Sequence, residues 1–133
     1  TRRSSNVPLA EVIPVEWKRE LIGEIGPKSA VHAAFAHGTN VQVARVLDSR
    51  TLEARIWERG VGPTSASGTS ACAVAAAAVK SGRVAPGQFE VRMVGGSMEV
   101  TVTAALDITL SGPVQEVSAG SLTGGFLEFL NGL

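Results

Sequence analysis

The 133-residue sequence lacks several features by which protein classes are recognised. Its single cysteine, Cys72, excludes an internal disulfide framework and an internal zinc site of four cysteines. Twelve Lys and Arg balance twelve Asp and Glu without a run of like charge, so neither a nucleic-acid nor a membrane surface is indicated. The longest uncharged apolar run, residues 71–79, is too short to cross a bilayer, and no signal segment opens the chain. We expect a soluble, cytoplasmic protein with a single domain over residues 1–133.

Common catalytic and nucleotide-binding motifs are also missing. The glycine-rich loop of the chain has no lysine after its glycines, so it is not a nucleotide P-loop. The dinucleotide fingerprint G-x-G-x-x-G and the nucleophile elbow G-x-S-x-G do not occur. His32 and His37 lie five residues apart with no third ligand nearby, so we interpret them as ordinary loop histidines and expect no metal site.

The most informative segment that is present covers residues 56–73. It begins at the end of an alternating strand and passes through a loop of Gly, Pro, Ser and Thr. It then opens an apolar helix at residues 71–79. Such a helix start aims unpaired backbone N–H groups at one point, where an anion can bind, and Gly68 would allow a carboxylate to approach the backbone closely. A simpler interpretation stays open, in which a Ser or Thr of this loop is only a helix N-cap.

Glu58 and Arg59 lie where the strand enters this loop. Adjacent opposite charges are most often solvated surface groups. At the mouth of an anion-binding loop they have a second interpretation, in which Arg59 holds a carboxylate in a fork and Glu58 takes an ammonium or a proton.

Periodicity and turn signals predict the remaining elements. A helix is expected over about residues 15–25, because Trp17, Leu21 and Ile25 recur at a spacing of four, and Gly26-Pro27 should end it. The tail from residue 114 onward has no assigned structure. An extended segment is expected at 6–13 and strands at 41–47, 51–57, 89–94, 98–103 and 108–111, of which the first four form two antiparallel hairpins.

The run at residues 71–79 has no polar face, so as a helix it should be enclosed on all sides. Nearly all of its side chains are small, so its neighbours should approach closely. A short alanine-rich helix wrapped by a curved, mostly antiparallel sheet meets both conditions. The expected fold class is therefore α+β.

Residues 57–73, WERGVGPTSASGTSACA, closely resemble the second-half signature of the diaminopimelate epimerase family. That signature reads roughly W/Y-E-R-G-x-G-E-T-x-A-C-G-T/S-G-A-C-A. Residues 38–41, 91–100 and 110–113 also agree with the family, in its order and at plausible spacing. The resemblance covers most of residues 35–114.

The resemblance implies a fold of two similar halves, each a curved sheet around a central helix, with the active site between them. This chain would be the C-terminal half alone, which agrees with its start without methionine. The family is cofactor-free. Two cysteines flank the α-carbon of the amino acid, one removing the proton as thiolate while the other reprotonates the opposite face. A helix N-terminus lowers the cysteine pKa and binds the α-carboxylate.

The implied partners are an amino-acid substrate and the N-terminal half of the same protein, and a homodimer stays open. The substrate would be LL-diaminopimelate, converted to the meso form in lysine biosynthesis. Five positions match the family's binding residues. Asn40 matches the substrate-binding asparagine of G-T-N, Glu58 and Arg59 match the E-R pair, and Gly68 and Thr69 match the backbone donors for the α-carboxylate.

The chain departs from the family at the position of the second catalytic cysteine, which Ser67 occupies. A hydroxyl is not appreciably ionised near neutral pH, unlike a thiol with a pKa of about 8.5, so two-base racemisation should be severely impaired. Cys72 matches the cysteine of A-C-A, a helix residue that is not the acid or base. Pro63 replaces the glutamate of G-E-T and Ser70 replaces a glycine. The family's N-P-H segment aligns best with residues 6–8, so its histidine is missing.

Three functions remain compatible with the sequence. The first is a diaminopimelate epimerase. The second is the same fold with one-base isomerisation or dehydration of another amino or hydroxy acid. The third is a non-catalytic module that binds carboxylates or dimerises. On this chain alone we expect no catalysis, because the cleft would have only one wall.

Overall fold

The structure of this chain is a computed structural model that describes residues 9–10, 18 and 20–132. Helices lie between groups of consecutive strands along the chain, which confirms the α+β fold class. In chain order the elements are β1 (Leu9–Ala10), α1 (Leu21–Ala30), β2 (Val41–Asp48), β3 (Thr51–Glu58), β4 (Gly62–Thr64), α2 (Gly68–Lys80), β5 (Gly87–Met93), β6 (Gly96–Val102), β7 (Ile108–Ser111) and α3 (Gly124–Asn131).

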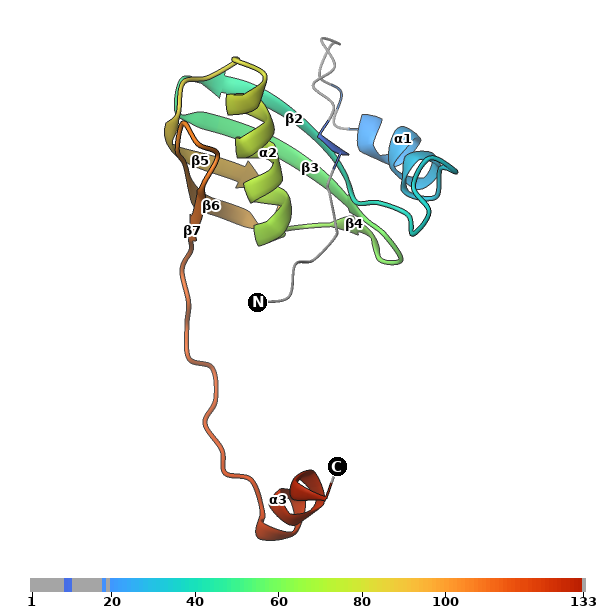
Figure 1. The fold of residues 1–133 in the computed structure, drawn as a ribbon, viewed down its shortest axis with the longest axis vertical. Coiled ribbons are helices and arrows are strands. Elements are labelled where there is room, and N and C mark those ends of the chain that lie inside the picture. The colour runs from blue at the N-terminus through green and yellow to red at the C-terminus, as the bar shows by residue number, and fades with distance from the viewer. Residues whose placement is uncertain (1–8, 11–17, 19, 133) are drawn as a thin grey trace.

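The strands of the described residues form one sheet, with the order β1-β2-β3-β5-β6-β7 and with β4 paired to β3 (Figure 1). The pairs β2–β3, β3–β4, β5–β6 and β6–β7 are antiparallel, whereas β1–β2 and β3–β5 are parallel. Both predicted hairpins, β2–β3 and β5–β6, are confirmed. The parallel pair β3–β5 is possible because α2 connects these strands and crosses the sheet between them.

The two helices nearest the strands cover opposite faces of the sheet. Leu52, Ala54 and Ile56 of β3 are at most 2% exposed and pack in one cluster with the inward side of α2. Trp57, the next residue along the strand, packs instead with Ile22 of α1. This follows from the alternation of side chains along a strand. The predicted alternation of β3 is therefore confirmed, and each large aliphatic side chain buried in this way contributes about 1.5–3 kcal/mol.

Helix α2 begins three residues earlier than the apolar run, at Gly68, and ends at Lys80. Its enclosure is one-sided. Ala71, Val74, Ala75 and Ala78 are buried against the sheet. The opposite side is only half-buried, because no element in the described part of the chain packs on it. The expectation of a helix enclosed on all sides is therefore wrong for the described part of the chain, in which only the sheet-facing side of α2 is enclosed.

The bounds predicted for the first helix are wrong at its C-terminal end. Helix α1 runs from Leu21 to Ala30, with Pro27 inside it, and residues 15–17 lie outside the described part of the chain. Gly26 does not end the helix because it is a contact point, where a Cβ atom would lie 2.7 Å from the Trp57 ring. Packing on Trp57 therefore outweighs the hydrogen bond that Pro27 cannot donate.

Two elements were not predicted. Strand β4 lies within the segment interpreted as a loop and pairs with the end of β3, Glu58 opposite Gly62. Helix α3 lies in the tail, has no buried residue, and is joined to β7 by an exposed segment, residues 112–123. Figure 1 shows this segment leaving the sheet and carrying α3 away from it. Neither element has a strong local pattern, since β4 depends on pairing and α3 contains two glycines.

A partly buried cluster of one carboxylate and two guanidinium groups, centred on Glu53 of β3, links the stability of the sheet to pH. Glu53, whose side chain is 12% exposed, lies 2.6 Å from Arg45 and 3.0 Å from Arg55. Desolvation raises the pKa of the Glu53 carboxyl, but the hydrogen bonds and charges of Arg45 and Arg55 outweigh it. The pKa is therefore held below its ordinary value of 4.5. A carboxyl with a lower pKa in the folded state stabilises the fold above its unfolded pKa, and this stability is lost as pH falls through the folded pKa.

We expect the free energy of unfolding to decrease as pH falls below about 4.5, and Glu53→Gln to remove part of this decrease. Urea unfolding at neutral pH and in acid measures the difference. The matched control is Glu90→Gln, because the ion pair of Glu90 with Arg92 is more exposed and should contribute less. An unchanged acid dependence in Glu53→Gln would contradict this assignment.

A candidate carboxylate-binding site at the start of helix α2

The first turn of α2 presents backbone donors that the side chain of its N-cap residue does not cap. Ser67 occupies the N-cap position with an extended backbone (φ −152°, ψ 122°), and its carbonyl accepts the first helical hydrogen bond, from Ala71 N–H at 3.0 Å. Its hydroxyl makes no capping bond and lies 3.3 Å from the Thr69 hydroxyl instead. The N–H groups of the first turn have no acceptor within the helix. The simple N-cap interpretation therefore does not account for Ser67.

The β5–β6 turn and strand β7 hold the loop that leads into α2. The Gly95 N–H, in the turn between β5 and β6, donates to the Ser65 carbonyl at 2.7 Å. Leu110 of β7 lies against Gly68 so closely that a Cβ atom on Gly68 would be 2.8 Å from Leu110 Cδ2. An apolar side chain beside the helix start lowers the local dielectric constant, which strengthens the attraction of the N–H groups for an anion.

Asn40 and Arg59, which are 19 residues apart in sequence, lie side by side. The Arg59 backbone N–H donates to Asn40 Oδ1 at 2.9 Å, and the Arg59 guanidinium donates to the His37 carbonyl. The Arg59 side chain passes directly over Gly38, which has a φ of +68°. The structure thus brings together the G-T-N segment and the E-R pair.

Glu58 is fixed by strand β4. Its carboxylate accepts a hydrogen bond from the Thr64 hydroxyl at 3.3 Å. Strand β4 leads from the end of β3 back to the start of α2 (Figure 1), and Ser67 follows Thr64 by three residues, a reach of at most about 11 Å. In residues 20–132 no hydrogen bond or ion pair joins Asn40, Glu58 or Arg59 directly to residues 67–69. The structure therefore connects the two groups through β4 but does not place them in contact.

No other group in the first turns of α2 is suited to proton transfer. Burial raises the pKa of the Cys72 thiol, so it remains protonated near neutral pH. His32 Nδ1 accepts a hydrogen bond from the nearby Ala34 N–H at 3.2 Å, and the His37 carbonyl accepts one from Arg59. In the described part of the chain, no hydrogen bond joins either histidine to residues 67–69. Among the residues that the structure describes, no three His, Cys, Asp or Glu side chains are grouped to hold a metal ion.

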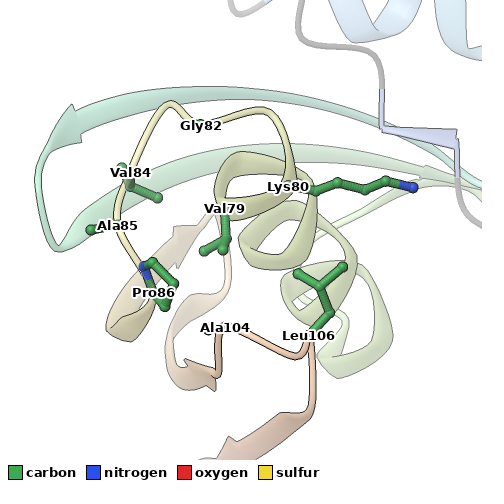
Figure 2. A pocket seen from close by; sticks show the side chains of 8 residues that line it. All are labelled: Val79, Lys80, Gly82, Val84, Ala85, Pro86, Ala104 and Leu106. Atoms are coloured by element: carbon green, nitrogen blue, oxygen red, sulfur yellow. The ribbon is translucent and has the colours of Figure 1, made fainter.

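A hollow of about 570 Å³ lies at the opposite end of α2 (Figure 2). Its lining side chains are apolar except for that of Lys80, which extends away from Val79 and Pro86 in Figure 2. It therefore lacks the charged partners that an amino acid needs. The lining residues are Val79, Lys80, Gly82, Val84, Ala85, Pro86, Ala104 and Leu106.

Three residues at the site were not singled out from the sequence. Thr64 holds Glu58, and Leu110 packs on Gly68. Gln42 of β2 is buried beneath α2, where its amide meets Ser70. The strand alternation places Gln42 among the polar residues, which would normally face solvent. Only the position of α2 over this part of β2 shows that both faces of the strand are covered here.

The fold and the helix start define an α+β domain that offers backbone N–H donors, an arginine and a carboxylate at one end of its sheet. The family model for diaminopimelate epimerase matches residues 10–117, which is most of the chain. The chain therefore belongs to the diaminopimelate epimerase family, which indicates an epimerase-like isomerase. A comparison with curated proteins found no match. No helix in the described residues is long and apolar enough to cross a membrane.

Gly38→Ala should displace Arg59 and destabilise the fold. The new Cβ atom would lie 2.7 Å from both Arg59 Cδ and the Ala30 carbonyl oxygen, in a backbone conformation that L-residues rarely adopt. We expect a loss of about 2–3 kcal/mol in the free energy of unfolding, with a shift of the Arg59 amide resonance. Gly60→Ala is the control, because Gly60 has a similar φ of +78° and open space around it, so about 1 kcal/mol should be lost. Equal losses in the two variants would contradict the close contact with Arg59.

Proposed function

We propose that this chain is the C-terminal substrate domain of a cofactor-independent amino-acid isomerase that converts LL- to meso-diaminopimelate. In this proposal the α-carboxylate binds at the start of α2. The observation that carries the proposal is the uncapped first turn, where the Ser67 hydroxyl faces Thr69 and leaves the helix N–H groups free for a ligand. The family assignment supports the choice of an amino acid as that ligand.

The helix start would assist proton removal as well as binding. When the α-proton leaves, negative charge develops on the α-carbon and spreads onto the carboxylate. Backbone donors at Gly68 and Thr69 would hold that charge with no reorganisation, aided by the partial positive charge of about +0.5 at a helix N-terminus. The contact of α2 with the sheet keeps these donors in place.

Glu58 and Arg59 would hold the charged groups beyond the α-carboxylate. The Thr64 hydroxyl orients the Glu58 carboxylate, which suits it to accept a substrate ammonium. Within the described residues, the Arg59 guanidinium donates its hydrogen bond to a backbone carbonyl, that of His37, so it could exchange this contact for a stronger one with the distal carboxylate. Asn40 would keep Arg59 in place through the backbone.

Proton transfer needs groups that this site does not provide. Ser67 is a hydroxyl, and the Cys72 thiol is held protonated by burial. We therefore propose that residues 1–133 form one wall of the active site and that an N-terminal half supplies the other wall with its cysteine. That cysteine would take the α-proton as thiolate, and the Ser67 hydroxyl would have to return a proton on the opposite face, so inversion should be slow. The partner would face the helix start, and metal or cofactor chemistry is not required.

Ser67 also favours a second candidate, a one-base isomerase or dehydratase that acts on a related amino or hydroxy acid. With only one ionisable group available, the proton would leave and return on the same face, or a neighbouring group would depart. The two candidates differ in solvent isotope uptake by the full-length protein in deuterated water. Stereoinversion with deuterium at the α-carbon of diaminopimelate supports the first candidate, whereas double-bond migration or loss of water supports the second.

Diaminopimelate should perturb the amide resonances of Gly68 and Thr69 in a nitrogen-15 NMR titration of this chain. We expect weak saturable binding, with a dissociation constant on the order of 1–10 mM, because only one wall is present. The matched control is the diamine of the same length without carboxylates, which should not shift these two amides. Shifts of equal size with the diamine, or none with diaminopimelate, would contradict carboxylate binding at α2.

Ser67→Cys should produce an acidic thiol. In a Cys72→Ala background, the introduced thiolate would lie at the helix N-terminus, so its pKa should be lower than about 8.5. The rate of reaction with a disulfide reagent as a function of pH measures this pKa. The wild-type protein is the comparison, because burial raises the pKa of its Cys72. A thiol pKa at or above the ordinary value would show that this helix start does not stabilise negative charge.

A further inference from the structure

A buried polar pair joins strand β2 to the first turn of α2. Gln42 is 4% exposed and Ser70, the third residue of α2, is 1% exposed. The Gln42 amide Nε2 donates to Ser70 Oγ at 3.0 Å. Ala71, the next residue of α2, belongs to the apolar cluster between the helix and the sheet, so the polar pair adjoins that cluster.

The pair is incompletely satisfied, because Gln42 Oε1 is buried and has no hydrogen-bond partner among the described residues. An unpaired buried acceptor costs more than one ordinary hydrogen bond returns, whereas apolar side chains of similar shape at both positions would be close to neutral. Global stability therefore does not explain why Gln42 and Ser70 are present. Buried polar groups of this kind need another explanation.

The position of Gln42 and Ser70 in the fold explains why a polar pair is present. Gln42 follows Asn40 by two residues, so the start of one strand makes two separate attachments. Asn40 holds the backbone of Arg59, and Gln42 holds α2 through Ser70. These contacts span 19 and 28 residues of sequence. The start of β2 is thus the common support of the Arg59 loop and of the helix N-terminus.

We propose that Gln42 is a positioning residue that fixes the first turn of α2, through Ser70, relative to Asn40 and Arg59. This proposal rests on the proposed function, since Gln42 would set the distance between the carboxylate-binding N–H groups of α2 and the Arg59 side chain. Ser70 replaces a glycine of the family pattern, so this attachment is a feature of the present chain. Neither Gln42 nor the Ser70 side chain would touch the substrate.

The double variant Gln42→Leu/Ser70→Ala tests the proposal, because it removes both polar groups and leaves neither unpaired. We expect its urea midpoint to be unchanged or higher. Hydrogen exchange of the Ala71 amide, which bonds to the Ser67 carbonyl, should become about tenfold faster, while that of Ser81 at the other end of α2 stays the same. The dissociation constant for diaminopimelate should rise about tenfold.

Val84→Ala is the control, since Val84 is buried in the same cluster beyond the C-terminal end of α2. It should lower the urea midpoint without a selective change at Ala71 and without a change in diaminopimelate affinity. If the double variant keeps the wild-type exchange rate at Ala71, the proposal is overturned. Wild-type protein that fails to bind diaminopimelate would refute the proposed function, while the exchange rate at Ala71 would still decide the role of Gln42.

Discussion

The packing of small side chains from α2 against the sheet is the contact on which the rest of the structure depends. Ala71 and Ala75 are completely buried, and they meet Phe89 and Val91, which are also completely buried. Alanine lets the helix backbone approach the strands, so the helix has little freedom to slide or tilt. Its N-terminus is thereby placed beside β7, where unpaired N–H groups can act together.

The candidate site separates the groups suited to binding from those suited to proton transfer. Backbone donors, the Asn40–Arg59 pair and the Glu58–Thr64 pair are all present and held by hydrogen bonds. The position expected to carry a thiolate is Ser67, whose hydroxyl bonds with Thr69. Binding and chemistry can therefore diverge independently in this fold, because the helix start depends on α2 whereas the acid or base is one side chain at the N-cap.

Prediction from the sequence succeeded where the pattern is local and periodic. The hairpins β2–β3 and β5–β6 and the helix after Gly68 follow from alternation and from the alanine run. It failed where a distant contact overrides a local signal. Gly26-Pro27 should end a helix, yet α1 continues because Trp57 packs on Gly26. Strand β4 and the burial of Gln42 were missed for the same reason, since each depends on an element from elsewhere in the chain.

The sequence by itself determined the fold class, the two hairpins, the apolar helix and the resemblance that points to an amino-acid carboxylate. It could do so because side-chain alternation, helical periodicity and the order of motif residues are all written along neighbouring positions. Only the tertiary structure decided that Asn40 holds Arg59, that Thr64 orients Glu58, and that Gln42 lies beneath the helix start. The partners in the first and last of these contacts are 19 and 28 residues apart in sequence, and they meet only because β3 and α2 pack on β2.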